Sequence, residues 1–245
     1  MADALIARLE RFVSLSDAER EAVAEAFLKR RSVKGGTQIV REKNEADGIV
    51  TIIDGMAGQY RVRADGKRQI VGYFLPGDFV HFGALASDET LFGVSTFTHS
   101  IVSVIETPDF LALVSSTPTL SRGFWHLTIE QLSIAREWIV QLGLASAEQK
   151  LAQFFCEQHY RMEEIGRADG GTISLPVTQR DLGDITGLTS VHVNRTLQEM
   201  RANGLIAFEG GALTILDSQR LRRIALFDSG YLEWRKGKWA PPIPA

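Results

Sequence analysis

A polar cluster in "GLTSVHVNRTLQEM", residues 187–200, has the side chains best suited to a specific chemistry. Arginine can donate two parallel hydrogen bonds to guanine, and asparagine can pair in both directions with adenine. Asn194 and Arg195 are adjacent here, and Val191, one helical turn earlier, suits a thymine methyl group. This combination predicts a surface that reads the edges of DNA bases. The alternative is an ordinary solvated helix face.

Local capping signals place this cluster on the second of two short helices. Thr178 can cap the first helix, with Asp181 placed favourably near the positive end of the helix dipole. Gly187 can end that helix because glycine tolerates the left-handed conformation, and Thr189 can cap the next one. A hairpin-like run around Gly210-Gly211 follows. The pattern predicts a winged helix-turn-helix whose second helix enters the major groove.

The residues expected to contact DNA lie at the two helix starts and along the outer face of the second helix. Hydroxyl and amide groups near helix starts suit phosphates, and the arginine suits a base edge. Residues 171–226 hold six arginines and five acidic residues, a net charge of only +1, so phosphate binding must depend on placement. The predicted DNA-binding residues are Thr178, Gln179, Arg180, Thr189, Ser190, Val191, His192, Asn194, Arg195 and Gln198.

Composition sets wider limits on the class of protein. The 245 residues are 44% hydrophobic and 23% charged, as in globular proteins of one large or two ordinary domains. The net charge of −3 does not exclude nucleic acid, because a small basic face can lie on an acidic body. The N-terminal stretch is amphipathic and charged, unlike a signal peptide or a membrane span, so we expect a cytoplasmic protein without membrane contact.

Short β-rich runs between residues 32 and 105 alternate with turn signals. Strands of this length and spacing predict an antiparallel barrel, roll or sandwich. The clearest hairpin is "RVRADGKRQI", in which Asp65-Gly66 is expected to supply the positive φ angles of a tight turn. Before it, Ser16 and Glu19 form a capping box for a short helix.

A long helix is expected from Trp125 to Leu144, because apolar residues recur there at helical spacing with little Gly or Pro. Its apolar face is broader than is needed to cover one small roll. We expect this face to meet its own copy across a two-fold axis, the alternative being packing within its own chain. The predicted dimerisation residues are Leu127, Ile134, Trp138 and Leu142. A further helix follows at residues 147–162, and the tail "KGKWAPPIPA" is Pro-rich and expected to be poorly ordered.

This order of elements resembles the Crp/Fnr family of transcription regulators. The matching residues are "DGKRQIVGYFLPGDF" in the β-rich part and "TQRDLGDITGLTSVHVNRTLQEMRANGLI" in the helix-turn-helix. Arg195 falls on the family's DNA-reading arginine. Many members have a glutamate where this chain has Val191, and serine or glycine where it has Asn194, which implies a different target sequence.

The resemblance implies an α+β protein with four segments. Residues 1–118 would form an antiparallel β-roll sensor, a cupin-like jelly roll with flanking helices, and residues 119–145 the dimerisation helix. Residues 146–228 would form the winged helix-turn-helix, and residues 229–245 a tail. It further implies a homodimer that binds double-stranded DNA at an inverted repeat and acts with RNA polymerase.

The sensor lacks the cyclic-nucleotide ligands of the family. The resemblance places Ala84 where those members have a glutamate for the ribose, and Leu91-Phe92 near their Arg-Ser pair. No arginine lies between Arg68 and Arg122, and burying a cyclic phosphate without a cation costs several kcal/mol. We therefore expect no binding of cAMP. For the pocket residues, the alternatives are an apolar or aromatic effector, no effector, or a place in the core of the roll. The pocket residues are His81, Phe82, Gly83, Ala84 and Leu85.

Other cofactors and functions find little support. Cys156 is the single cysteine, which excludes a disulfide framework and a cysteine-ligated iron–sulfur cluster, and a buried structural thiol is expected. The histidines show no metal-ligand spacing, so no metal is expected. One histidine and an apolar pocket can suffice for haem, which stays open with His81 as first candidate. No catalytic constellation stands out, so no enzyme is expected. The rival is a cyclic-nucleotide-binding-like regulatory or protein-interaction module without a DNA-binding role; the capped helix-turn-helix argues against it.

Overall fold

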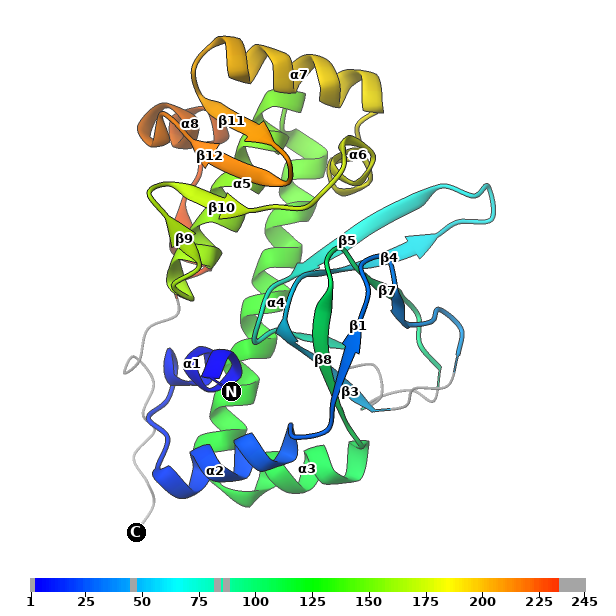
Figure 1. The fold of residues 1–245 in the computed structure, drawn as a ribbon, viewed down its shortest axis with the longest axis vertical. Helices are drawn as coiled ribbons and strands as arrows, with labels where there is room; N and C mark the ends of the chain where they lie inside the picture. Colours follow the sequence, from blue (N-terminus) through cyan, green and yellow to red (C-terminus); the bar gives the residue numbers. More distant parts are fainter. Residues whose placement is uncertain (1–2, 45–47, 82–84, 86–88, 234–245) are drawn as a thin grey trace.

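The helix α4 (Pro118–Leu144) is the longest element, and the other elements pack along it (Figure 1). Thr117 caps this helix by accepting a hydrogen bond from the Leu120 amide. Pro118 lies in the first turn, where a missing N–H costs nothing. The helix therefore begins before Trp125, where apolar spacing alone predicted it. The computed structural model describes residues 3–44, 48–81, 85 and 89–233.

The β-rich part forms two antiparallel four-stranded sheets, ordered β1-β8-β3-β6 and β2-β7-β4-β5. Ile52, Val94 and Val102 are fully buried between them. This arrangement is the antiparallel roll expected from the sequence. The strands are β1 (Arg30–Val33), β2 (Gln38–Val40), β3 (Ile49–Asp54), β4 (Ala57–Val62), β5 (Arg68–Phe74), β6 (Phe79–His81), β7 (Gly93–Thr96) and β8 (Ser100–Ile105).

The β4–β5 hairpin is present, but its turn differs from the prediction. Gly66 has a φ of 79°, whereas Asp65 has no positive φ. The Gly66 amide donates to the Arg63 carbonyl over 2.9 Å, and the Arg63 amide donates to the Lys67 carbonyl over 2.9 Å. This is a type I turn followed by a left-handed glycine, which needs one positive φ instead of two. The hairpin extends beyond the sheets toward the other end of the molecule (Figure 1).

Three shorter helices pack with α4 on the outer side of the first sheet. They are α1 (Asp3–Glu10), α2 (Asp17–Ala26) and α3 (Thr107–Ser116). The predicted capping box is present, since Ser16 and Glu19 exchange side-chain and backbone hydrogen bonds at the start of α2. Phe79, Phe110 and Phe124 meet edge to face within this layer and close it against the sheet. None of the helices in the described part of the chain is long and apolar enough to cross a membrane.

The C-terminal part combines helices with a four-stranded sheet ordered β11-β12-β10-β9. Its elements are α5 (Ala147–Glu164), β9 (Ala168–Asp169), β10 (Thr172–Ser174), α6 (Gln179–Thr186), α7 (Ser190–Ala202), β11 (Ile206–Glu209), β12 (Ala212–Ile215), α8 (Ser218–Ala225) and the 3-10 helix η2 (Ser229–Tyr231). Leu232 is fully buried, so the folded chain continues past residue 228 and the predicted tail begins too early. The stretch "KGKWAPPIPA" lies outside the described residues.

The roll and the C-terminal part share one apolar cluster. Ile70, Tyr73 and Leu75 from β5 and the residue after it belong to the same cluster as Phe155 of α5 and Leu182 of α6. Because these side chains are at most 2% exposed, the roll side and the helical side bury one another. The two parts are distinct in sequence but continuous in their core.

Candidate DNA-binding surface

The first helix of the predicted motif, α6, has the expected ends. Thr178 and Asp181 form a capping box, in which the Thr178 hydroxyl accepts from the Asp181 amide over 3.1 Å. Gly187 ends the helix with a φ of 68°, in the left-handed region. A Cβ on Gly183 would lie 2.7 Å from the Leu188 carbonyl oxygen. Gly183 is therefore required by the turn that follows α6.

The second helix, α7, presents a polar face to solvent. Thr189 caps it by accepting from the His192 amide over 3.3 Å. Val193, Leu197 and Met200 are fully buried against the rest of the motif, as the spacing predicted. The helix lies along the outer edge of the molecule, with no described element beyond it (Figure 1). Its uncovered face is thus free to enter a groove.

The predicted contact residues are gathered on this face and at the start of α6. Val191 is 79% exposed, and the Arg195 side chain is 66% exposed. Arg195 Nε lies 3.8 Å from Glu199 Oε1, a loose surface pair that leaves most of the guanidinium accessible. Asn194 is half-buried because it contacts Gln179, and its Nδ2 donates to Gln179 Oε1 over 3.1 Å. The remaining exposed residues of the predicted set are Thr178, Arg180, Thr189, Ser190, His192 and Gln198.

The wing follows α7 directly. Strands β11 and β12 pair in antiparallel register from Ile206↔Ile215 to Glu209↔Ala212. Gly210 and Gly211 join them with φ angles of 58° and 79°. Two successive positive φ angles define the tight turn that matches the twist of the strands. The hairpin predicted after the second helix is confirmed.

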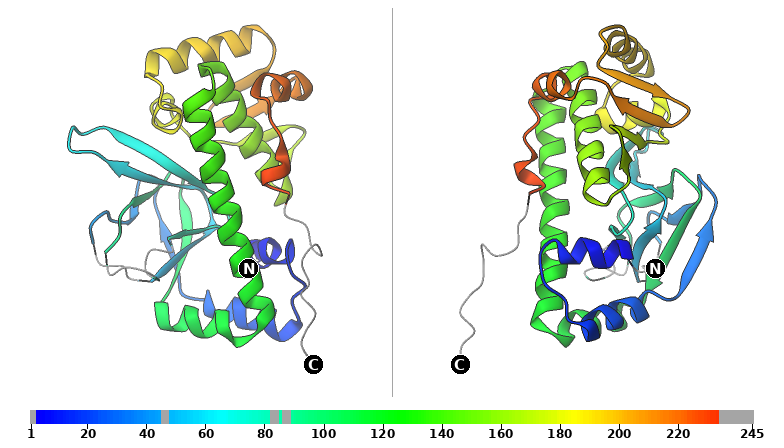
Figure 2. Two further views of the ribbon diagram at one scale, coloured as in Figure 1. Left: turned by 180° about the vertical axis from the view of Figure 1, so that it is seen from behind. Right: turned by 60° about the vertical axis from the view of Figure 1, so that its left-hand side comes forward.

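The β4–β5 hairpin of the roll docks onto α6, a contact that sequence reasoning did not identify. Arg68 Nε donates to Asp184 Oδ2 over 2.7 Å, and Arg68 Nη2 donates to Asp181 Oδ1 over 2.5 Å. Gln69 Nε2 donates to the Asp184 carbonyl over 2.6 Å. Both views in Figure 2 show the hairpin beneath α6. Partners more than a hundred residues apart in the chain carry no local signal of their pairing.

Charge is distributed unevenly around this contact. A cleft of about 440 Å³ lies between the hairpin and α6, and it is lined by Arg63, Lys67 and Arg180 among others. Burial lowers the pKa of Arg68, but the hydrogen bonds and charges of Asp184 and Asp181 outweigh it, so the net shift is upward. Arg68 therefore stays charged, and Asp184, which also lines the cleft, is engaged by Arg68.

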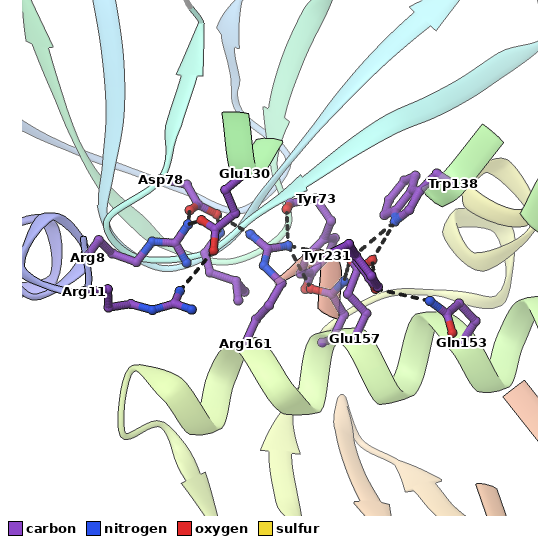
Figure 3. Close-up of polar contacts among 12 residues, drawn as sticks. Arg8, Arg11, Tyr73, Asp78, Glu130, Trp138, Gln153, Glu157, Arg161 and Tyr231 are labelled. Carbon is purple, nitrogen blue, oxygen red and sulfur yellow. Dashed lines mark hydrogen bonds and ion pairs between the residues drawn. The ribbon is translucent and has the colours of Figure 1, made fainter. Parts of the chain in front are cut away.

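A buried polar network joins the roll, α1, α4 and α5 (Figure 3). Asp78, in the turn before β6, lies between two arginines: its oxygens are 2.7 Å from Arg8 Nη2 and 2.6 Å from Arg161 Nη2. Glu130 of α4 lies 2.6 Å from the same Arg8 nitrogen. All four side chains are at most 3% exposed, so each charge depends on its partners to offset the free-energy cost of leaving water.

The network continues along α5 to the C-terminal 3-10 helix. Glu157 accepts hydrogen bonds from Tyr231 Oη over 2.9 Å and from Trp138 Nε1 over 3.1 Å. Burial raises the pKa of Glu157, while Arg161 and these donors oppose the shift. Arg11 Nη2 donates to the Leu232 carbonyl over 3.1 Å and joins the segment after α1 to the residue after η2.

The predicted effector residues fall mostly outside the described part. Phe82, Gly83 and Ala84 are not among the described residues, His81 is described only as the last residue of β6, and Leu85 is 41% exposed. The roll has a cavity of about 430 Å³ elsewhere. Two arginines, Arg31 and Arg41, line this cavity. They were not predicted from the sequence because they precede the stretch that the family resemblance marked. Its lining includes Arg31, Val40, Arg41, Asn44, Val50, Thr90 and Val104.

Cys156 is buried within the shared core, as predicted for a structural thiol. Burial raises the pKa of this thiol to about 12. The thiolate is the reactive form of cysteine, so the side chain is inert at neutral pH. Within the described residues no group of three or more His, Cys, Asp or Glu side chains could hold a metal ion.

The dimerisation residues predicted on the long helix require correction. Leu127, Ile134 and Trp138 are 2%, 7% and 9% exposed, because they pack within the protomer. They form the inner face of α4, so the prediction was wrong for these three. Leu142, at 39% exposure, remains accessible. A second apolar stripe faces outward instead and consists of Trp125, Ile129, Leu132 and Ile139.

Comparisons with known proteins agree with this architecture. The model of the Crp-like helix-turn-helix domain matches residues 149–224, and that of the cyclic nucleotide-binding domain matches residues 30–117. The chain is 30% identical over 197 residues to the nitrogen fixation regulation protein FixK of Bradyrhizobium diazoefficiens, covering 80% of this chain and 82% of that one. It is 29% identical over 217 residues to the transcriptional activator protein FnrL of Cereibacter sphaeroides, covering 87% of each.

Solved structures show the same fold. FixK2 from Bradyrhizobium japonicum superposes with a TM-score of 0.71 at 25% identity, covering 80% of this chain and 96% of that one. TTHB099, a regulator from Thermus thermophilus, superposes with a TM-score of 0.67 at 17% identity, covering 80% and 97%. With its roll, long helix and exposed winged helix-turn-helix, this chain belongs to the Crp/Fnr family and is a DNA-binding transcription regulator.

Proposed function

We propose that the protein binds an inverted-repeat DNA site as a homodimer, with one α7 in the major groove of each half-site. The observation that carries this proposal is the uncovered polar face of α7, framed by two capped helix starts. Helix-turn-helix dimers read half-sites about one helical turn, roughly 34 Å, apart. Operator symmetry then follows from the symmetry of the dimer.

The side chains divide into two roles. Arg195 reaches outward from the middle of α7, and a guanidinium can form two hydrogen bonds with a guanine. Arg180, exposed in the first turn of α6, suits a phosphate, which fixes the register of the protein without reading sequence. Val191, 79% exposed, offers an apolar contact to a thymine methyl group.

The outward stripe of α4 supports the dimer. Trp125, Ile129, Leu132 and Ile139 follow spacings of four, three and seven residues, which is the pattern of a two-helix seam. Seen from behind, α4 lies at the near side of the molecule (Figure 2). A second copy related by a two-fold axis would cover this stripe and set the two α7 helices on one side of the assembly.

The expected partner on the promoter is RNA polymerase, which the dimer would recruit or block according to where its site lies. In vitro transcription from a promoter carrying the selected site, with and without the protein, measures the direction of the effect. A change in transcript amount that requires the site supports regulation through the polymerase.

Selection from random-sequence DNA followed by electrophoretic mobility shifts tests the DNA-binding proposal. We expect an enriched inverted repeat, a specific band, and an affinity that falls steeply with salt because phosphate contacts release counterions. A sequence without internal symmetry, or equal affinity for all DNA, would contradict it.

A further inference from the structure

Asn194 is held by a residue of the preceding helix, and this contact decides which of its atoms remain for a base. Its Nδ2 donates to Gln179 Oε1 over 3.1 Å. Gln179 is the first residue of α6, and both side chains are half-buried. Among the described residues, Gln179 Nε2 and Asn194 Oδ1 have no hydrogen-bond partner.

A DNA phosphate would fix which end of the Gln179 side-chain amide faces Asn194. Phosphate oxygens only accept hydrogen bonds, so they select the Nε2 end of Gln179. The first turn of α6, beside the capping Thr178, also favours an anion because the helix dipole is positive there. With Nε2 toward the phosphate, Oε1 faces Asn194 and accepts the observed hydrogen bond. The reversed amide would set a carbonyl oxygen against the phosphate.

Asn194 then keeps one Nδ2 hydrogen and the Oδ1 lone pairs, a donor beside an acceptor. Adenine offers the matching pair in the major groove, the N7 acceptor and the N6 donor. Guanine offers two acceptors there, which would oppose Oδ1. We propose that Gln179 is a positioning residue that orients the Asn194 amide and so makes Asn194 select adenine. This inference rests on the proposed function, in which α7 occupies the major groove.

The experiment compares base preference in four variants. The first three are Asn194→Ala, Gln179→Ala and Gln179→Glu. Gln219→Ala, an exposed glutamine in the first turn of α8, is the matched control. Sites are selected from random DNA with the wild type, and each variant is then measured on the selected site and on copies changed at single base pairs. Thermal unfolding of each variant is recorded beside the binding data.

For the wild type we expect adenine at one position in each half-site. Asn194→Ala should lower that preference about 10-fold, and Gln179→Ala should lower it at the same base pair by at least about 3-fold. Gln179→Glu should keep the preference, because a carboxylate still accepts from Asn194, but should bind all DNA less tightly through phosphate repulsion. Gln219→Ala should match the wild type.

Different failures point to different errors. If Gln179→Ala keeps the full adenine preference while Asn194→Ala loses it, the positioning role is overturned and DNA reading stands. Loss of the preference in Gln179→Glu as well would overturn it too, as would selection of another base at the Asn194 position. If the wild type selects no sequence, the proposed function itself is wrong and the inference falls with it.

Discussion

The guanidinium of Arg68 lies 2.7 Å from the carboxylate of Asp184, a contact that joins the β4–β5 hairpin of the roll to the first helix of the DNA-binding motif. The Arg68 side chain is 28% exposed and that of Asp184 19% exposed, so the pair is partly shielded from water. Because α6 contacts both the hairpin and α7, it connects the roll to the DNA-binding face.

Arg68→Ala should loosen α6 without unfolding the roll. The pair is partly exposed, so a double-mutant cycle of Arg68→Ala and Asp184→Ala in urea unfolding should give a coupling of about 1 kcal/mol. Hydrogen exchange of the α6 amides should quicken in Arg68→Ala. Lys67→Ala is the control, because within the described part of the chain the Lys67 ammonium forms an ion pair with exposed Asp65 alone, at 3.7 Å. Equal exchange in both variants would show that the hairpin does not hold α6.

Arg195→Ala and Arg180→Ala should separate base reading from phosphate contact. Loss of a bidentate guanine contact should cost about 1–3 kcal/mol at the selected site, with much less effect on random DNA. Arg180→Ala should weaken both DNAs similarly and make the salt dependence shallower. Titrations of each variant on both DNAs at several salt concentrations measure this. Equal losses for Arg195→Ala on the two DNAs would make Arg195 a backbone contact.

Ile129→Glu combined with Ile139→Glu should give a folded monomer. These side chains are 39% and 68% exposed in the protomer, so the change affects the surface and leaves the core intact. Sedimentation velocity should report the monomer mass, and affinity for the inverted repeat should fall sharply. Leu28→Glu, at a 64% exposed position outside α4, controls for a surface apolar-to-acid change. A dimer that survives the double change would move the interface away from this stripe.

Cys156 should resist thiol reagents in the native protein. Burial raises the pKa of the thiol to about 12, so the reactive thiolate stays negligible up to pH 9 and grows only as pH approaches that value. Reaction with a chromogenic disulfide at pH 8 should be slow in buffer and fast in denaturant. Fast native labelling at pH 8 would contradict the burial and would reopen a redox role.

Cyclic nucleotides should bind negligibly. The sequence holds Ala84 at the ribose-binding position that the family resemblance indicates, and no arginine between Arg68 and Arg122. At that position a full negative charge would be buried without a cation, which is strongly disfavoured, whereas Arg31 and Arg41 line a separate cavity of the roll. Calorimetry with millimolar cAMP or cGMP should show no heat beyond dilution. A micromolar dissociation constant for either nucleotide would refute this reading of the roll.

Local chemistry explains which parts of the site could be predicted. Thr178, Gly187 and Thr189 each act within one helical turn, so their types and spacing define the two helices and the turn between them. The Gly210-Gly211 hairpin is equally local. These signals were confirmed, and the distant Arg68 binds Asp181 without displacing the Thr178–Asp181 capping box.

The long helix shows why the rest could not be predicted. Helical periodicity reveals that α4 is apolar on more than one side, but it does not say which side packs within the protomer. Residues 134 and 139 are both isoleucine, yet Ile134 is 7% exposed and Ile139 is 68% exposed. Only the positions of the roll and α5 decide between them. The hairpin contact of Arg68 with α6 is distant in sequence in the same way.

The core shared by the roll and the winged helix bears on how such regulators diversify. Ile70, Tyr73 and Leu75 of the roll side are packed in one cluster with Phe155 and Leu182 of the DNA-binding side. A recombination that exchanged either half for that of a relative would join two surfaces shaped for other neighbours. A functional exchange of either half would therefore need matched substitutions along the seam.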